Sequence, residues 1–470
     1  MRCDSVIGLE VHVELKTETK LFCSCKNEFG AEPNTNICPV CTGQPGALPY
    51  TNKNAVLLAL RAAAMLGCDI NRRSEQCRKH YFYPDLPKGY QISQRETPIG
   101  INGSFEFAFG DEIRRIRIHQ VHLEEDAGKL VHFGNGTTGV DYNRAGVPLI
   151  EIVTEPDLRS ADEVHSFLEA LRRALIRTGV SDCRMEQGAL RCDINVSLKV
   201  SGEEVPGERV EMKNVNSFSS AEHAVEYEIK RQSEKLLRGE KISRETRRWD
   251  EENRCSHLMR DKESAIDYKF MPDPDIPAYI IPAAEVERAF SELPESEVSR
   301  RARYEACGIS KNDVEIIVCD KEMSHFIDSC EGNVAECAKL LVGEVSAHLS
   351  KGERTLSETK LAPKALSELA GMLACGKINR QSAKPILKKL LSEGGSALKY
   401  AGEYVMISDE SMLSGTVAEV LSENPAAVAD YKRGKCEVCA FLTGQCMKKL
   451  RGRADAMKLN EILDEKLKEI

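Results

Sequence analysis

Short segments in which apolar and polar residues alternate dominate the first 290 positions of the chain. Such alternation predicts β-strands with one buried face, over residues 6–15, 114–123, 148–153, 190–199 and 208–213. Between these segments, apolar residues recur at helical spacing over residues 54–67, 161–178 and 221–237. This mixture predicts an α+β domain built on an antiparallel sheet, with the proline-rich residues 271–282 as its extended end.

From about residue 283 the pattern is almost wholly helical. Helix starts are predicted at Ser291, Ser310, Ser357 and Asn424. Residues 340–349 and 361–373 predict amphipathic helices, and residues 393–408 predict a hinge. We therefore predict three domains, namely an α+β domain over 1–292, an all-α domain over 293–407 and a helical tail over 408–470.

Four cysteines form a C-x-C pair and a C-x-x-C pair within residues 23–41, namely Cys23, Cys25, Cys38 and Cys41. Zinc is bound tetrahedrally by four thiolates, and a turn such as 38–41 can donate amides to sulfur. The spacing favours a knuckle-like insertion with structural zinc. A metal-free remnant with free thiols and a redox centre are the alternatives.

The chain has 18 cysteines, and its first residues alternate and carry charge, unlike a secretory signal. We therefore expect reduced thiols and a cytoplasmic protein, with the bacterial cytosol as its location. No run of about 18 apolar residues predicts a membrane span. The net charge of −9 excludes a global attraction to nucleic acid, so any such contact needs a local basic patch.

Ionisable residues occupy the polar faces of the predicted strands. Glu10 and His12 alternate with apolar residues in the first strand. Glu151 lies within an apolar run, where a carboxylate needs a partner or a metal. The later strands add further members, namely Arg191, Asp193, Glu211 and Lys213.

The second strand changes phase, which predicts a bulge near His119–Gln120. After the bulge, alternation favours Glu124 over Glu125 on the polar face. An ordinary sheet with one solvated face is the simpler interpretation of any single strand. Together, the five strands favour a site for Mg²⁺, which binds through carboxylates and substrate phosphates. The absence of a G-x-x-x-x-G-K-[ST] motif excludes a P-loop, so ATP would bind on the sheet through metals.

Several long blocks closely resemble the B-subunit family of the aspartyl/glutamyl-tRNA amidotransferases (GatB). They include VIGLEVHVEL (6–15), YFYPDLPKGYQISQ (81–94), HLEEDAGKL (122–130), DYNRAGVPLIEIVTEPDLRS (141–160) and EMKNVNSF (211–218). The resemblance covers about residues 5–290, and GEVSAHLS (343–350) and GQCMKKLRGRA (444–454) extend it into the helical part. It implies a cradle domain related to glutamine synthetase and guanidino kinases, which bind ATP and metals on one face of an antiparallel sheet.

The resemblance also implies a reaction. Family members phosphorylate the side-chain carboxylate of Glu or Asp misacylated onto tRNA(Gln) or tRNA(Asn), and ammonia then displaces phosphate. On this basis we expect His12, Glu125 and Glu151 to hold Mg²⁺, with Glu10 and Asp193 close by and Glu124 competing with Glu125. The 81–94 loop would lie near the aminoacylated 3′ end, where Tyr81 and Tyr83 could stack on a base and Lys88 could meet a phosphate. Arg191, Glu211 and Lys213 complete the expected substrate site.

No amidase-type or Cys/His hydrolase set is evident, so ammonia should come from another subunit. The resemblance implies an amidase-like A subunit as glutaminase, a small C subunit and misacylated tRNA as partners in a heterotrimer. A local basic patch in the tail is the expected tRNA contact, with a solvated helix face as the alternative, and comprises Lys448, Lys449, Arg451 and Arg453.

Two other functions fit part of the pattern. One is a noncatalytic, zinc-containing tRNA-binding adaptor. The other is a stand-alone ligase, resembling glutamine synthetase, that amidates a free amino acid. The basic tail would have no purpose in such a ligase.

Overall fold

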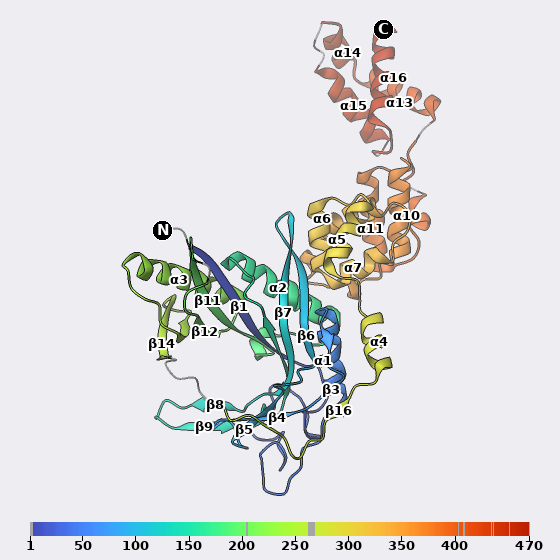
Figure 1. Ribbon diagram of the computed structural model, residues 1–470. Helices are drawn as coiled ribbons and strands as arrows, with labels where there is room; N and C mark the ends of the chain where they lie inside the picture. The colour runs from blue at the N-terminus through green and yellow to red at the C-terminus, as the bar shows by residue number, and fades with distance from the viewer. Residues whose placement is uncertain are drawn as a thin grey trace. The chain divides into compact units, whose positions relative to one another are not determined.

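The computed structural model describes residues 3–203, 205–261, 268–402, 404–407, 409–433, 435, 437–450 and 452–469. The chain divides into two compact units, Met1–Val298 and Ser299–Ile470 (Figure 1). The first unit contains all the described strands, and the second is helical. The chain therefore combines an α+β unit, dominated by antiparallel pairing, with an all-α unit.

The strands are β1 (Cys3–Glu14), β2 (Asp69–Ile70), β3 (Arg73–Ser74), β4 (Cys77–His80), β5 (Tyr90–Ser93), β6 (Gly100–Phe109), β7 (Glu112–Glu125), β8 (Lys129–His132), β9 (Thr138–Asp141), β10 (Pro148–Thr154), β11 (Leu190–Val200), β12 (Val210–Val215), β13 (Glu245–Asp250), β14 (Cys255–Asp261), β15 (Met271–Pro272) and β16 (Tyr279–Ile280).

The helices of the first unit are α1 (Lys53–Met65), α2 (Ala161–Arg177), η1 (Met185–Gln187), α3 (Phe218–Leu237) and α4 (Ala283–Ser291). The later helices are α5 (Glu297–Ala306), α6 (Lys311–Cys319), α7 (Lys321–Asp328), α8 (Val334–Leu340), η2 (Leu341–Val345), α9 (Ser346–Gly352), η3 (Leu356–Glu358), α10 (Pro363–Ala374), α11 (Arg380–Glu393), α12 (Ala397–Ala401), α13 (Glu410–Glu423), α14 (Pro425–Lys432), α15 (Val438–Lys449) and α16 (Ala456–Glu469).

A nine-stranded sheet organises the first unit, in the order β14-β13-β12-β11-β1-β10-β7-β6-β2. Every described pair in it is antiparallel except β12 with β13. The central strand β1 pairs with β10 on one side and β11 on the other, although both follow it by more than 130 residues. The five strands expected from alternation are all present and include the middle of this sheet.

Helices cover one face of the sheet (Figure 1). Helix α1 packs against β6 and β7, α2 against β6, and α3 against β11 and β12. The alternate residues Ile7, Leu9, Val11 and Val13 of β1 are fully buried in the resulting apolar cluster. Because successive side chains of a strand point to opposite faces, the polar residues of β1 must lie on the face away from the helices.

The predicted bulge in β7 is confirmed. Gln120 pairs with Val153 and Ile118 with Thr154, so His119 is the extra residue on β7. Asn102, at the same level of the neighbouring strand β6, has a left-handed φ of 54°. The insertion lets Ile116 and Ile118 face the helices while His122 faces away from them.

The second unit contains two apolar clusters, one formed within residues 304–401 and one within residues 413–467. Its helices depart from the sequence pattern in several places. Residues 340–349 do not form one α-helix, because a π-helical turn, η2, lies between α8 and α9. A short helix, α12, lies inside the predicted hinge. The division into three domains remains our proposal.

Two of the four predicted helix starts are confirmed. The Ser310 side chain accepts a hydrogen bond from the Asp313 amide at the start of α6, and Asn424 directly precedes Pro425 of α14. Ser291 instead ends α4, where its hydroxyl donates to the Arg288 carbonyl. Ser357 lies within the short helix η3. Among the described residues, no helix is both long and apolar enough to cross a membrane.

Removal of the Phe167 ring should destabilise the first unit. Phe167 is fully buried on α2, and its ring packs edge-on against Phe105 at 5.9 Å and Phe107 at 5.7 Å. We expect Phe167→Ala to lower the free energy of unfolding by about 3–5 kcal/mol, because it leaves a cavity between helix and sheet. Fluorescence of Trp249, the single tryptophan and a buried residue of β13, reports unfolding of this unit.

Phe133→Ala is the matched control, because this ring is 53% exposed after β8. We expect it to change the free energy of unfolding by less than about 0.5 kcal/mol. Equal losses for the two variants would contradict the assignment of Phe167 to the core between α2 and the sheet.

Candidate active site

The strand register assembles a row of ionisable residues on the polar face of the sheet. On β1, His12 stands opposite Arg191 of β11 and Glu151 of β10, and Glu151 stands opposite His122 of β7. Opposed side chains of antiparallel strands lie about 5 Å apart at Cβ. This central row, Arg191–His12–Glu151–His122, thus gathers residues from four strands.

His12 forms an ion pair with a buried carboxylate. Its Nδ1 lies 3.2 Å from Oε1 of Glu124, whose Oε2 accepts a hydrogen bond from the Ser93 hydroxyl at 3.2 Å. Burial alone lowers the pKa of His12, but the hydrogen bond to Glu124 and the charges of Glu124 and Glu151 outweigh it and raise the pKa to about 9. Burial raises the pKa of Glu124, and the bond to His12 reverses that shift.

Glu151 is the least satisfied carboxylate of the row. Its nearest cationic partner among the described residues is Nδ1 of His122, at 3.9 Å. Burial, followed by the charge of Glu124, raises the pKa of Glu151 to about 7. Burial likewise lowers the pKa of His122 to about 4, so its imidazole is neutral and supplies little compensating charge. A buried carboxylate of this kind is suited to a cation that the protein itself does not supply.

Glu125 points elsewhere than Glu124. Its carboxylate accepts hydrogen bonds from Nζ of Lys88 and from the Ile92 amide at 2.9 Å. It therefore ties the 81–94 loop to the end of β7. The structure brings Glu124 to His12, as alternation favours, whereas Glu125 as the metal ligand stays a prediction.

A second carboxylate cluster lies beside the row. Ligand atoms of Glu10, Asp193 and Glu211 lie within 4.8 Å of one another. Lys213 bridges two of them, with Nζ 2.5 Å from Asp193 Oδ2 and 3.0 Å from Glu211 Oε1. Three carboxylates at this separation repel one another, so the cluster also suits a hard cation.

Neutral donors orient the cluster. The Asn195 amide donates to Glu10 Oε1 at 3.0 Å, and the Thr246 hydroxyl donates to Glu211 Oε2 at 2.9 Å. Each bond leaves the other carboxylate oxygen for a ligand. The sequence analysis identified Glu10, Asp193, Glu211 and Lys213, but not the role of Thr246, which comes from the parallel neighbour β13.

Asp126 is a site residue that the sequence analysis missed. Its Oδ2 accepts from Arg191 at 2.8 Å and lies 3.4 Å from Nε of Arg144. It thereby fixes the guanidinium at one end of the central row. The signal was present, because Asp126 directly follows Glu124 and Glu125 in the HLEEDAGKL block.

The 81–94 loop exposes two aromatic rings and holds a third. Phe82 and Tyr83 are 90% and 57% exposed. Tyr81 packs edge-on against Tyr268, with ring centroids 6.1 Å apart, and burial raises its pKa. The exposed rings are available to a ligand, whereas Tyr81 belongs to the loop packing.

The four cysteines of the insertion form one cluster, with their Sγ atoms within 4.8 Å of one another. Sulfurs around a tetrahedral zinc are about 3.8 Å apart, given Zn–S bonds of about 2.3 Å. The Cys38 amide lies 3.2 Å from Cys41 Sγ, and Nζ of the fully buried Lys20 lies 3.6 Å from it. These donors favour a thiolate, and the pKa of Cys41 is lowered by its contact with Cys23 and then by these donors. The donor set fits a soft or borderline divalent metal.

Comparison with known proteins identifies the family. Residues 5–287 match the family model described as the GatB/GatE catalytic domain, and residues 325–467 match the model described as the GatB domain. The chain belongs to the GatB family. The carboxylate–imidazole row and the cysteine cluster both lie in the part that matches the catalytic domain of this family.

Relatives match along the full length. The chain is 44% identical over 472 residues to the B subunit of the aspartyl/glutamyl-tRNA(Asn/Gln) amidotransferase of Brevibacillus brevis, covering 99% of this chain and 98% of that protein. It is 45% identical over 473 residues to the protein of the same name from Shouchella clausii, covering 99% of each chain. The corresponding protein of Carboxydothermus hydrogenoformans is 42% identical over 474 residues, covering 99% of this chain and 98% of that protein.

The basic patch lies in the part that matches the GatB domain, and its charges are not equally available. Lys448 and Lys449 are exposed at the end of α15. Lys449 is paired with Glu419 at 2.9 Å and Glu423 at 2.7 Å. Arg453 is half-buried, and Arg451 lies outside the described residues. Of the described members, Lys448 is therefore better placed than Lys449 to meet a phosphate.

The cysteine insertion should be sensitive to substitution at Gly43. Its φ is +68°, and a Cβ there would lie 2.7 Å from Cγ and 3.0 Å from Cα of Lys88. We expect Gly43→Ala to lower the free energy of unfolding by about 2–4 kcal/mol, from backbone strain plus overpacking. Urea unfolding followed by Trp249 fluorescence measures the loss.

Gly46→Ala is the control, because Gly46 has a φ of +84° but a Cβ there meets nothing within 4 Å. This variant carries only the backbone strain, of about 1 kcal/mol. If both variants lose the same free energy, the insertion does not press against Lys88 as described.

Proposed function

We propose that this chain performs the transamidation step on misacylated tRNA, as the names of its relatives state for those proteins. The reaction is ATP-dependent conversion of Glu-tRNA(Gln) to Gln-tRNA(Gln), of Asp-tRNA(Asn) to Asn-tRNA(Asn), or of both. The observation that carries the proposal is the buried, charge-rich central row on the sheet of the matched catalytic domain. A noncatalytic tRNA adaptor has no need of such a costly group of buried charges.

The chemistry explains why charged groups gather there. A carboxylate oxygen of the aminoacyl group attacks the γ-phosphorus of ATP, the bond to ADP breaks, and an acyl phosphate forms. Ammonia then attacks the acyl carbon, and phosphate leaves with the electrons of the broken C–O bond. Both steps develop negative charge on oxygen, which fixed cationic groups stabilise.

Two groups of residues are suited to hold magnesium. His12 and Glu151, with Glu124 or Glu125, form the first set, and the carboxylate cluster Glu10–Asp193–Glu211 forms the second. Bound Mg²⁺ would neutralise phosphate charge during transfer. The weak compensation of Glu151 and the crowding of three carboxylates support these assignments.

Cationic and aromatic side chains complete the proposed substrate site. Arg191, oriented by Asp126, and Lys213, held between two carboxylates, offer positive charge at the edge of the cation sites. The exposed Tyr83 can stack on the 3′-terminal base. Lys88 is engaged by Glu125 and positions the loop, so a direct phosphate contact would require that pair to open.

We also propose that the cradle is related to the glutamine synthetase and guanidino kinase folds. The nine-stranded, mainly antiparallel sheet, with helices on one face and ionisable groups on the other, supports this relationship. Ammonia would come from an amidase-like A subunit, and a small C subunit would complete the heterotrimer. The tail would contact the body of the tRNA through Lys448 and its neighbours.

Substitution of Glu151 tests the catalytic role. We expect Glu151→Gln to reduce ATP-dependent amidation by the assembled enzyme at least about 100-fold, because the neutral amide is a poor cation ligand of nearly the same shape. Amidated tRNA is measured by the rate of Gln-tRNA or Asn-tRNA formation, and binding of misacylated tRNA is measured separately and should not change.

Glu226→Gln, on the exposed side of α3, is the control and should retain full activity. Full activity of the Glu151 variant would instead favour the noncatalytic adaptor.

Metal analysis tests the cysteine cluster. We expect about one zinc ion per purified chain, because four thiols lie within the span of a tetrahedral site. Cys38→Ser should lower the zinc content well below one, whereas Cys307→Ser, which changes an exposed cysteine outside the cluster, should not. A zinc-free wild-type chain would contradict structural zinc.

A further inference from the structure

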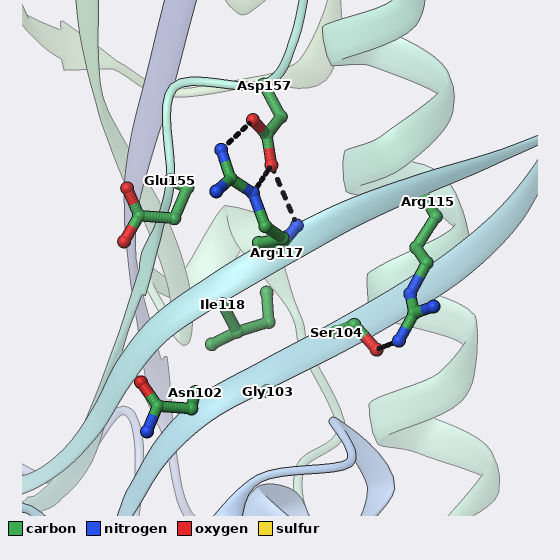
Figure 2. Close-up of a pocket in the computed structure, with 8 residues that line it drawn as sticks. All are labelled: Asn102, Gly103, Ser104, Arg115, Arg117, Ile118, Glu155 and Asp157. Carbon is green, nitrogen blue, oxygen red and sulfur yellow. Dashed lines mark hydrogen bonds and ion pairs between the residues drawn. The ribbon is translucent and has the colours of Figure 1, made fainter.

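A hollow of about 700 Å³ lies over β6, β7 and the end of β10 (Figure 2). Its lining includes Asn102, Ser104, Arg115, Arg117 and Glu155. The bulge at His119 and the left-handed Asn102 lie at its edge, where both strands depart from regular geometry. Bulges of this kind redirect neighbouring side chains and often accompany functional sites.

The hollow shares a face of the sheet with the central row. Glu155 follows Glu151 by four residues, and its amide donates to the Arg117 carbonyl, so the pairing of the two chains continues past the end of β10. Because side chains alternate, Glu151 and Glu155 point to the same side. Four extended residues span about 13 Å, which is comparable with an extended nucleoside triphosphate.

The charged groups of the hollow differ in how they are paired. Asp157 holds Arg117 through Nε at 2.8 Å and a second nitrogen at 2.6 Å, so that guanidinium is neutralised in place (Figure 2). Arg115 donates to the Ser104 hydroxyl at 2.9 Å and, within the described part of the chain, makes no ion pair with a carboxylate. Glu155 is held by His119 at 2.9 Å and retains a second oxygen. A planar cation and an acceptor oxygen are thus available to a ligand.

The direction of phosphoryl transfer limits which ligand fits. The acceptor and the leaving group lie roughly in line, on opposite sides of the transferred phosphorus. The 81–94 loop, where the aminoacyl end is proposed to enter, is tied to Glu125, which pairs with Pro148 at the start of β10. The hollow lies at the other end of β10, on the far side of the central row, where the leaving ADP is required.

We propose that this hollow holds the adenosine end of ATP, with the adenine against the guanidinium of Arg115 and a ribose hydroxyl donating to Glu155. The assignment rests on the proposed ATP-dependent function. A guanidinium stacks on aromatic faces as an ammonium does not, and a carboxylate is a common partner of ribose hydroxyls. The triphosphate then extends along β10 toward His12 and Glu151.

Steady-state kinetics of the assembled enzyme test the base contact. We expect Arg115→Gln to raise the KM for ATP about tenfold, with kcat and the KM for misacylated tRNA within about twofold of wild type. Arg115→Lys should recover little, because it restores charge without the planar stack. Arg114→Gln is the control, since this neighbour pairs with Glu163 of α2 on the helix-covered face and should leave the KM for ATP unchanged.

Deoxynucleotides test the ribose contact. With 2′-deoxy-ATP and 3′-deoxy-ATP, the wild-type enzyme should show a KM about tenfold higher than for ATP with at least one of them. Glu155→Ala should abolish that difference, which a purely structural loss would leave in place.

The outcomes separate the two proposals. If Arg115→Gln leaves the KM for ATP unchanged while Glu151→Gln abolishes amidation, the hollow is not the adenosine site and the proposed function stands. If the KM for tRNA rises instead, the hollow takes the 3′ end of the tRNA, and the assignment to ATP is overturned. If neither substitution affects amidation, the proposed function itself fails.

Discussion

The site depends on how β1 is held between β10 and β11. Its odd-numbered residues from Ile7 to Val13 are buried against the helices, so the even-numbered residues Glu10 and His12 must face the other way. A slip of one residue would bury the charges under the helices and expose the apolar residues, at a cost of many kcal/mol. The burial of one face thus fixes the chemistry of the other, without any interaction between the catalytic groups themselves.

The polar face is electrostatically unfavourable in isolation. Glu124 and His12 neutralise each other, but Glu151 and the carboxylate cluster retain negative charge with little local compensation. Buried charges seldom add stability, and removing one partner usually leaves the other unpaired. The arrangement is therefore better explained by ligands that bring positive charge than by a contribution to folding.

The cysteine insertion contributes support rather than chemistry. Gly43, just after the cysteine cluster, lies so close to Lys88 that it has no room for a side chain, and Lys88 in turn holds Glu125. The insertion, the 81–94 loop and the end of β7 therefore form one connected contact. Lys20 reinforces it, because its buried ammonium reaches both Cys41 and the Tyr142 carbonyl.

The sequence by itself determined the strands, their buried faces and the bulge at His119, because alternation and its change of phase are local properties of the chain. It also separated Glu10, His12 and Glu151 from the core residues beside them. It did not determine which strands are neighbours. The pairing of His12 with Glu124, of Arg191 with Asp126 and of Glu211 with Thr246 joins residues 35 to 112 positions apart. Those partners, and the hollow beside Arg115, were decided only by tertiary structure, because strand order and loop packing follow from how the whole sheet closes against its helices.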